Sequence, residues 1–374
     1  MAPEASRHHC ALASLISTVN VLSSYKRIQH DKVARSCSFI ERMQPQYSEY
    51  LINYHRFLHT VRVGVNQNFA FLQEVLENIP RTLGSMIYIP RTFEIDPKSK
   101  PSHSEVEELL LVLKEVRREW SAEGRSERDQ YYIPLLQRAE ALFPKHRSDV
   151  RVLVPGQRLG RLVFELVKRG FRCEGHESSY LRAAFACFIL SNPIPDNHYT
   201  IHPFLHCLSA NLRDEDRTRM VHFPDENPNA ILSQSSLCSF VLGDFTNGYK
   251  HQAGEWDLVV TCLFLQTEPN VIGCMEVIFD CLRPGGHWLN LGSLASAYHK
   301  RKNQALLTPS HEDMRHIIEE IGFIVTEEGT EIRGTFCATQ SSMRQVQYRN
   351  VLLVCRKPAD VGVQQVKTEV VEDV

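Results

Sequence analysis

The first 145 residues carry apolar positions at the spacing of amphipathic helices. Apolar residues recur three and four positions apart over residues 12–22, 71–79 and 106–120. That spacing places them on one face of a helix, where their ordinary role is packing against a neighbouring helix. The proline-rich stretch 90–101 indicates a loop between the last two helices. We therefore expect residues 1–145 to form an all-α N-terminal extension.

From residue 146 the pattern changes to short β-rich runs that alternate with helical stretches. The runs occupy residues 150–154, 171–174, 239–242, 256–262 and 287–291, and helical spacing occurs at 162–168 and 271–282. Strands that alternate with helices indicate a parallel sheet covered on both faces. We expect a doubly wound α/β domain over residues 146–358, completed by a helix at 311–321 and strands at 323–326 and 348–355. The acidic tail, residues 359–374, is expected to be disordered.

Composition narrows the class of protein. Lys+Arg 42 and Asp+Glu 44 nearly cancel, so the chain has no basic field for a nucleic-acid partner. No apolar run approaches the roughly 18 residues that span a bilayer, so no membrane contact is expected. The 11 cysteines include no C-x-x-C pair, which disfavours a metal site and a disulfide framework. Reduced thiols fit the cytoplasm, and the nucleus is left open as a second compartment.

Several residues suited to ligand binding follow the predicted strands. Gly156 and Gly160 lie in the turn after the first strand, where backbone N–H groups can approach a ligand closely. Glu177 ends the second strand and can accept hydrogen bonds from both hydroxyls of a ribose. Asp244 and Phe245 follow the third strand and suit an adenine amino group and the face of the base. Because the full G-x-G-x-x-G of dehydrogenases is missing, S-adenosylmethionine is favoured over a dinucleotide.

Over residues 112–358 the chain resembles the carnosine N-methyltransferases. The shared motifs are LKEVRREW (113–120), VLVPG (152–156), LGRL (159–162), GHESS (175–179), HPFLH (202–206), FPD (223–225), GDF (243–245), LRPGG (282–286), WLNLG (288–292) and VCRKP (354–358). The resemblance implies a class I methyltransferase fold, Rossmann-like, with an N-terminal helical extension. It also implies transfer of the methyl group of S-adenosylmethionine to the imidazole of carnosine (β-alanyl-histidine), which gives anserine. The implied partner is a small histidine-containing peptide, carnosine or another di- or tripeptide, and a homodimer is compatible with the sequence.

The resemblance implies roles for nine residues. Those implied to contact the cofactor are Arg118 at the methionine carboxylate, Gly156 at the methionine, Glu177 at the ribose, Asp244 and Phe245 at the adenine, and Cys262 in the pocket wall. Those implied to hold the substrate are Gln266, His299 and Tyr348. By sequence alone, Arg118 would be interpreted as an exposed helical charge and Cys262 as a small buried hydrophobe. His299, beside Lys300, would be interpreted as a solvated loop residue.

Five positions depart from the pattern of that family. They are Gln266 for an aspartate, Arg158 for a glycine, Glu115 for a glutamine, Val346 for a tyrosine and His176 for an asparagine. Methyl transfer leaves positive charge on the acceptor ring, and an amide can accept the ring N–H without supplying a compensating charge. Two alternatives therefore stay open beside carnosine methylation. One is the same enzyme fold with another acceptor, such as a protein histidine, and the other is a catalytically weakened scaffold.

Overall fold

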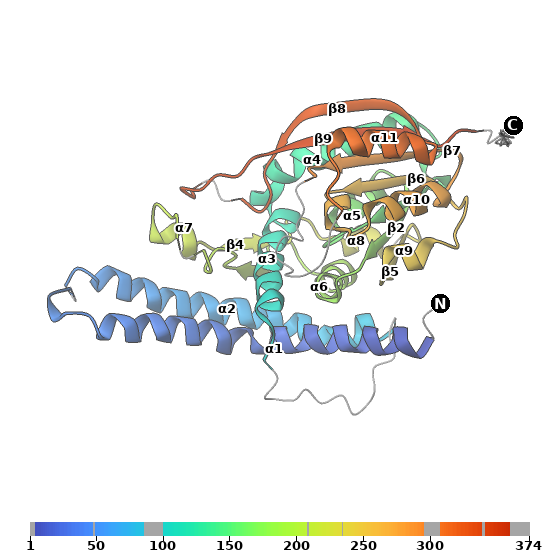
Figure 1. Cartoon of the computed structure of the whole chain (residues 1–374). Helices are drawn as coiled ribbons and strands as arrows, with labels where there is room; N and C mark the ends of the chain where they lie inside the picture. The colour runs from blue at the N-terminus through green and yellow to red at the C-terminus, as the bar shows by residue number, and fades with distance from the viewer. Residues whose placement is uncertain are drawn as a thin grey trace, which may run out of the picture.

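The computed structural model describes residues 4–47, 49–85, 100–207, 209–233, 235–294, 307–338 and 341–359. A hairpin of two long helices, α1 (Glu4–Glu41) and α2 (Ile52–Thr82), lies below an α/β body, and α3 (His103–Trp120) runs between them (Figure 1). These helices confirm the three helical stretches expected before residue 145. Most of the loop expected at 90–101 and of the tail expected at 359–374 lies outside the described residues. The division of the chain at residue 145 stays a prediction.

The body is built on a seven-stranded sheet in the order β5-β2-β1-β6-β7-β9-β8. Its strands are β1 (Arg151–Pro155), β2 (Arg172–Glu177), β5 (Cys238–Leu242), β6 (Trp256–Cys262), β7 (Leu282–Gly292), β8 (Ile324–Gly334) and β9 (Tyr348–Arg356). The first five in chain order pair in parallel, and β9 runs antiparallel to both β7 and β8. The strand order reverses direction at β1, as in a doubly wound sheet. The α/β fold class expected from the sequence is confirmed, and it is the class I methyltransferase fold.

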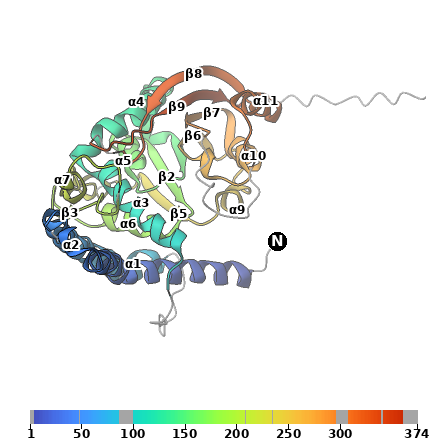
Figure 2. The same cartoon turned by 60° about the vertical axis from the view of Figure 1, so that its left-hand side comes forward.

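Helices cover both faces of this sheet. They are α4 (Arg125–Leu142), α5 (Arg161–Lys168), α6 (Tyr180–Ser191), α8 (Asn229–Leu232), α9 (Phe245–Tyr249), α10 (Val271–Cys281) and α11 (His311–Ile321). The short helix α7 (Asp214–Thr218) lies apart from the sheet, against α2 (Figure 1). Figure 2 shows α4 and α5 on one side and α9, α10 and α11 on the other. Successive residues of β6 point to opposite faces of the sheet. Leu258 packs in the cluster with α4 and α5, and Val259 packs in the cluster with α10 and α11.

Aromatic packing joins the helical hairpin to the body. Phe71 of α2 is buried, and its ring centroid lies 5.0–5.9 Å from the rings of Phe185, Phe188, Tyr199 and Phe223. Two of these rings come from α6 and two from a small antiparallel sheet of β3 (Tyr199–Ile201) and β4 (Val221–Phe223). Rings in such edge-on contacts contribute beyond the area they bury. The hairpin is therefore packed into the core that also supports α3.

Local signals for α11 are confirmed in detail. Ser310 and Asp313 form a capping box at its start, and Gly322 ends it with φ of 111°. All 11 cysteines are free thiols. Among the described residues, no helix combines the length and the apolar character needed to cross a bilayer.

Candidate functional site

The predicted site residues gather where parallel strands end. β1 ends at Pro155, β2 at Glu177 and β6 at Cys262, and Asp244 follows β5 by two residues. Parallel strands present their carboxyl ends at one edge of a sheet, and open α/β sheets bind ligands outside that edge. We call this edge the carboxyl rim. The structure therefore brings Gly156, Glu177, Asp244 and Cys262 together, while their contact with a cofactor stays a prediction.

The turn after β1 needs left-handed backbone at three positions. The φ angles are 64° at Gly156, 57° at Arg158 and 81° at Gly160. A Cβ on Gly156 would lie 2.4 Å from Cδ2 of Phe264, which follows β6. Glycine at 156 thus serves close contact as well as backbone conformation. Arg158 adopts the same region with a side chain, which is a strained arrangement of the kind found at functional sites.

Glu177 joins the end of β2 to that turn. Its Oε1 accepts the backbone N–H groups of Ser178 and Ser179 at 3.0 and 2.9 Å, and its Oε2 accepts the N–H of Arg158 at 3.0 Å. Burial raises the pKa of Glu177, and the charge of Arg182 opposes this rise. Because each carboxylate oxygen can accept two hydrogen bonds, Oε2 keeps room for a hydroxyl donor. This is the side chain that the sequence assigned to a ribose.

The residues assigned to adenine combine a buried ring with an exposed carboxylate. Phe245 is buried, and its ring centroid lies 5.3 Å from that of His176 and 5.5 Å from that of Phe264. Asp244 is exposed and caps α9 by accepting the backbone N–H of Asn247 at 2.8 Å. The cap holds Asp244 at the rim, where its second oxygen can accept an amino group.

His176, one of the departures from the family pattern, connects β2 to the end of β5. Its Nε2 lies 2.8 Å from the carbonyl oxygen of Gly243. Burial lowers the pKa of His176 to about 4, so the ring is neutral at physiological pH and its Nε2–H donates this bond. Its Nδ1 is buried and has no hydrogen-bond partner among the described residues.

Arg118 is buried rather than exposed, which corrects the interpretation from sequence alone. Its Nη1 pairs with Glu119, and its Nε lies 3.5 Å from Oε1 of Glu127. The guanidinium carbon lies 5.1–5.4 Å from the ring centroids of Tyr131, Tyr132 and Phe336. Within the part of the chain that is described, Nε and Nη2 of Arg118 have no hydrogen-bond acceptor although both are buried. Unpaired buried donors are costly, so these two nitrogens indicate that an anionic ligand completes the site.

Arg118 lines a small cavity together with Gly156 and Cys262. Burial raises the pKa of the Cys262 thiol to about 12, so this wall of the cavity is uncharged. The cavity measures about 10 Å³, enough for roughly one water molecule. Arg158 also lines the cavity, and its guanidinium is held by Glu115. The donor set therefore fits S-adenosylmethionine, but the methionine part of the cofactor needs Arg158 to move.

The predicted substrate residues are placed less completely. Gln266 lies in the 3₁₀ helix Leu265–Thr267, and its Oε1 accepts a hydrogen bond of 3.2 Å from Oγ of Ser293, just after β7. Tyr348 begins β9 opposite Gly334. Because β9 runs antiparallel to β7, its first residue lies at the carboxyl rim. His299 lies outside the described residues, so its place beside Gln266 and Tyr348 stays a prediction.

Four residues at the rim received no role from the sequence. They are Arg182, Phe264, Glu268 and Phe336. Phe264 follows β6 within an apolar run, so the sequence predicts only that it is a core residue. Phe336 lies in the segment after β8, where no periodicity marks it. Arg182 is identified only by its ion pair with Glu115, which needs the packing of α3 against α6.

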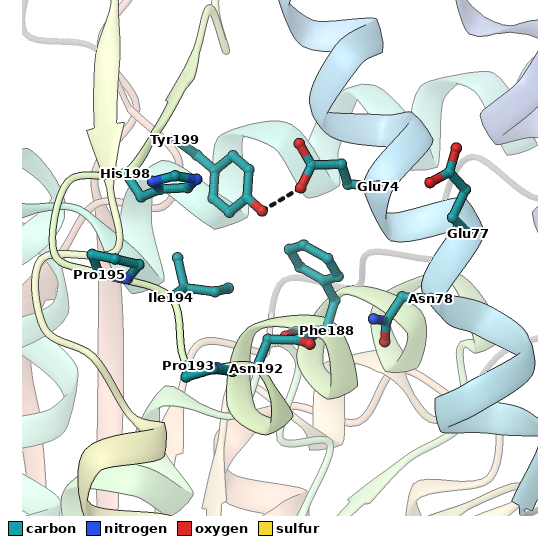
Figure 3. Close-up of a pocket in the computed structure, with 10 residues that line it drawn as sticks. All are labelled: Glu74, Glu77, Asn78, Phe188, Asn192, Pro193, Ile194, Pro195, His198 and Tyr199. Atoms are coloured by element: carbon teal, nitrogen blue, oxygen red, sulfur yellow. Dashed lines mark hydrogen bonds between the residues drawn. The ribbon is translucent and has the colours of Figure 1, made fainter.

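A larger hollow lies away from the rim (Figure 3). It measures about 360 Å³ and is lined by α2, α6 and the segment between α6 and β3. Glu74, Glu77 and Asn78 line one wall, and the hydroxyl of Tyr199 donates to Glu74 from the other. None of the described site residues lines it. The hollow is therefore separate from the cofactor site.

The chain is similar in sequence to known proteins over most of its length. A family model described as "Carnosine N-methyltransferase" matches residues 96–359. Carnosine N-methyltransferase of Rattus norvegicus is 31% identical over 344 residues, which cover 91% of this chain and 85% of that protein. Carnosine N-methyltransferase unmet of Drosophila melanogaster is 31% identical over 355 residues, 87% of this chain and 76% of that protein. The Schizosaccharomyces pombe relative of the same description is 30% identical over 265 residues, 67% of this chain and 71% of that protein.

Proposed function

Because the chain belongs to the carnosine N-methyltransferase family, a family of S-adenosylmethionine-dependent enzymes, we propose that it methylates the histidine imidazole of carnosine to give anserine. Other short histidine-containing peptides are included in the proposal as acceptors. The observation that carries it is Arg118, whose Nε and Nη2 are buried at the cavity beside Gly156 and have no hydrogen-bond acceptor among the residues that the structure describes. An α-carboxylate supplies the two acceptor oxygens that such a guanidinium lacks.

Each described site residue has a distinct task in this proposal. Bound S-adenosylmethionine would supply a methyl group on a sulfonium, which is an electrophile. Arg118 would hold its carboxylate, Glu177 the ribose hydroxyls and Asp244 the adenine amino group. Because in-line methyl transfer depends on alignment, positioning by these fixed groups would supply much of the acceleration.

The acceptor ring requires a partner for the nitrogen that is not methylated. A neutral imidazole presents one lone pair and one N–H, and Oε1 of Gln266 can accept that N–H. Oε1 accepts a hydrogen bond of 3.2 Å from Oγ of Ser293 and keeps a second lone pair for the ring. As positive charge develops on the ring, the amide stabilises it by its dipole alone. We therefore expect slower transfer than a carboxylate at this position would give.

One observation favours a second candidate, in which the chain keeps the methyltransferase fold as a shell but does not catalyse methyl transfer. Arg158 lines the cavity of about 10 Å³ beside Arg118, and its Nη1 is held by Glu115 at 2.7 Å. If the arginine never leaves, the pocket cannot admit the methionine part of a cofactor. The two candidates differ in a direct assay, because the shell would bind no S-adenosylmethionine and label no acceptor.

The test is a methylation assay on the full chain with a radiolabelled methyl donor. Carnosine, other histidine-containing dipeptides and a histidine-containing protein mixture serve as acceptors, and chromatography identifies the labelled product. The proposal expects anserine, and it expects Arg118→Met to lose most of the label. Arg169→Met, a substitution on the far end of α5, is the matched control. Label found only in protein histidine, or in no acceptor, would contradict the proposal.

A further inference from the structure

The side chain of Arg158 bridges three elements of the site. It starts in the turn after β1, and its Nη1 donates to Oε1 of Glu115 on α3 at 2.7 Å. Its Nη2 donates to the carbonyl oxygen of Leu263, after β6, at 3.3 Å. Its guanidinium carbon lies 4.8 Å from the ring centroid of Phe336. Arg158 lines the small cavity beside Arg118, and these contacts hold its guanidinium against α3 and the segments after β6 and β8.

Glu115 has a second ion-pair partner besides Arg158. It is fully buried, and it also accepts hydrogen bonds from Nε and Nη2 of Arg182 at 2.8 and 3.2 Å. Burial by itself would raise the pKa of Glu115, but the charges of Arg182 and Arg158 hold that pKa below its usual value. Removing one partner from a buried ion pair is strongly unfavourable when it leaves a charge alone. Here the departure of Arg158 leaves Glu115 paired to Arg182, so that penalty is avoided.

The backbone of Arg158 is held independently of its side chain. Its φ of 57° is fixed by the hydrogen bond from its own N–H to Glu177. The guanidinium can therefore exchange partners by side-chain rotation without disturbing the turn. Its bond to Leu263, at 3.3 Å, is long for an N–H···O contact and adds little to its hold.

We propose that Arg158 is a second carboxylate-binding residue, which exchanges Glu115 for the α-carboxylate of the cofactor as the methionine part enters beside Arg118. The inference rests on the proposed function, because it concerns the same cofactor site. The guanidinium groups of Arg118 and Arg158 then both face this carboxylate. By leaving Glu115, Arg158 also makes room for the methionine part. The free chain keeps the methionine end of the pocket closed, and a ligand that lacks a carboxylate gains nothing from Arg158.

The test compares two ligands that differ in the amino-acid part. S-adenosylhomocysteine carries the α-carboxylate, and 5′-methylthioadenosine keeps the nucleoside and the sulfur but has no carboxylate. Their dissociation constants are measured by titration calorimetry for the wild type, Arg158→Met and Arg169→Met. We expect Arg158→Met to weaken S-adenosylhomocysteine about tenfold or more, as expected when a charge-assisted hydrogen bond is lost. Binding of 5′-methylthioadenosine should change less than about twofold, since it makes no such bond. Arg169→Met should match the wild type for both ligands.

The possible contrary results separate this inference from the proposed function. Tighter binding of S-adenosylhomocysteine by Arg158→Met would show that the arginine only obstructs the pocket. Equal weakening of both ligands would show that it supports the turn rather than the carboxylate, and thermal melts of each variant identify a folding defect. A wild type that binds neither ligand would overturn the proposed function itself. A wild type that binds both, with no difference between them in Arg158→Met, would overturn this inference alone.

Discussion

The backbone N–H of Arg158 donates a 3.0 Å hydrogen bond to Oε2 of Glu177. Together with the 2.9 Å bond from the N–H of Gln157 to the carbonyl oxygen of His176, it joins the turn after β1 to the end of β2. These two segments face the methionine and ribose parts of the proposed cofactor. The bond to Glu177 also holds a residue with a side chain at φ of 57°, a conformation that costs about 1 kcal/mol outside glycine. The carboxylate that is proposed to hold the ribose is thus also the residue that shapes the turn.

Glu177→Gln should therefore affect stability and cofactor affinity together. The amide keeps one acceptor oxygen, but it turns an NH₂ group toward backbone donors that the carboxylate accepted. We expect a loss of about 1–3 kcal/mol in the free energy of unfolding, measured by urea denaturation. We also expect S-adenosylmethionine to bind at least about tenfold more weakly. Glu174→Gln, on the same strand, is the control: it loses bonds to Ser239 and Tyr249 and should leave cofactor affinity unchanged.

Gln266→Asp should increase the turnover of carnosine. A carboxylate beside the ring N–H adds charge stabilisation as the methylimidazolium forms, and single electrostatic groups in active sites often change kcat by about 10²-fold. We expect a gain of about tenfold or more in kcat with little change in cofactor affinity. Gln266→Asn has the same side-chain length as the Asp variant but no charge, so it should show no gain. Equal rates for the Asp and Asn variants would place Gln266 away from the acceptor ring.

His176 should make the fold sensitive to acid. Its pKa is about 4 in the folded chain against about 6.5 when unfolded, so the unfolded state binds more protons between these values. The stabilisation is complete above pH 6.5 and is lost as the pH falls toward 4, at most about 3 kcal/mol. His176→Asn should flatten the fall in the free energy of unfolding across this window. His198→Asn, at an exposed position, should keep the wild-type slope, and an unchanged slope in His176→Asn would refute the assignment.

Glu268→Gln should stabilise the chain at alkaline pH. Burial, together with the charges of Asp244 and Glu177, raises the pKa of Glu268 to about 7. The folded state therefore binds more protons between pH 4.5 and 7, and stability falls as the pH rises through that window. Because the side chain is partly exposed, we expect a gain of only about 1–2 kcal/mol at pH 8, and none at pH 4.5. Glu276→Gln on exposed α10 surface is the control, and a gain at both pH values would point to a cause other than charge.

The elements with strong local signals were predictable. The apolar runs of β1 and β6 are buried on both faces, and α11 carries both a capping box and a terminal glycine. The length of β8 was not predictable, because this edge strand runs to Gly334 with exposed Glu327, Glu328 and Glu331 in place of apolar residues. The pairing of β3 with β4 was also missed, since three-residue strands carry too little pattern.

The site was predictable where it depends on strand ends and not where it depends on packing between distant elements. Gly156, Glu177 and Asp244 follow strands whose order fixes the carboxyl rim. The burial of Arg118 depends on three aromatic rings, one of them Phe336 from more than 200 positions along the chain. No sequence pattern predicts such a contact between residues so far apart in the chain. The same holds for the ion pairs of Glu115, whose two partners come from the turn after β1 and from α6.

Titration calorimetry of the full wild-type chain with S-adenosylmethionine tests the central claim most directly. The claim is that the buried Nε and Nη2 of Arg118, which have no hydrogen-bond acceptor among the described residues, and the carboxylate of Glu177 form one cofactor site at the carboxyl rim. The predicted result is saturable binding of one cofactor per chain, weakened at least about tenfold in Arg118→Met, as the loss of a charge-assisted bond implies. No heat of binding at millimolar cofactor, or the same affinity in Arg118→Met as in the wild type, would contradict it.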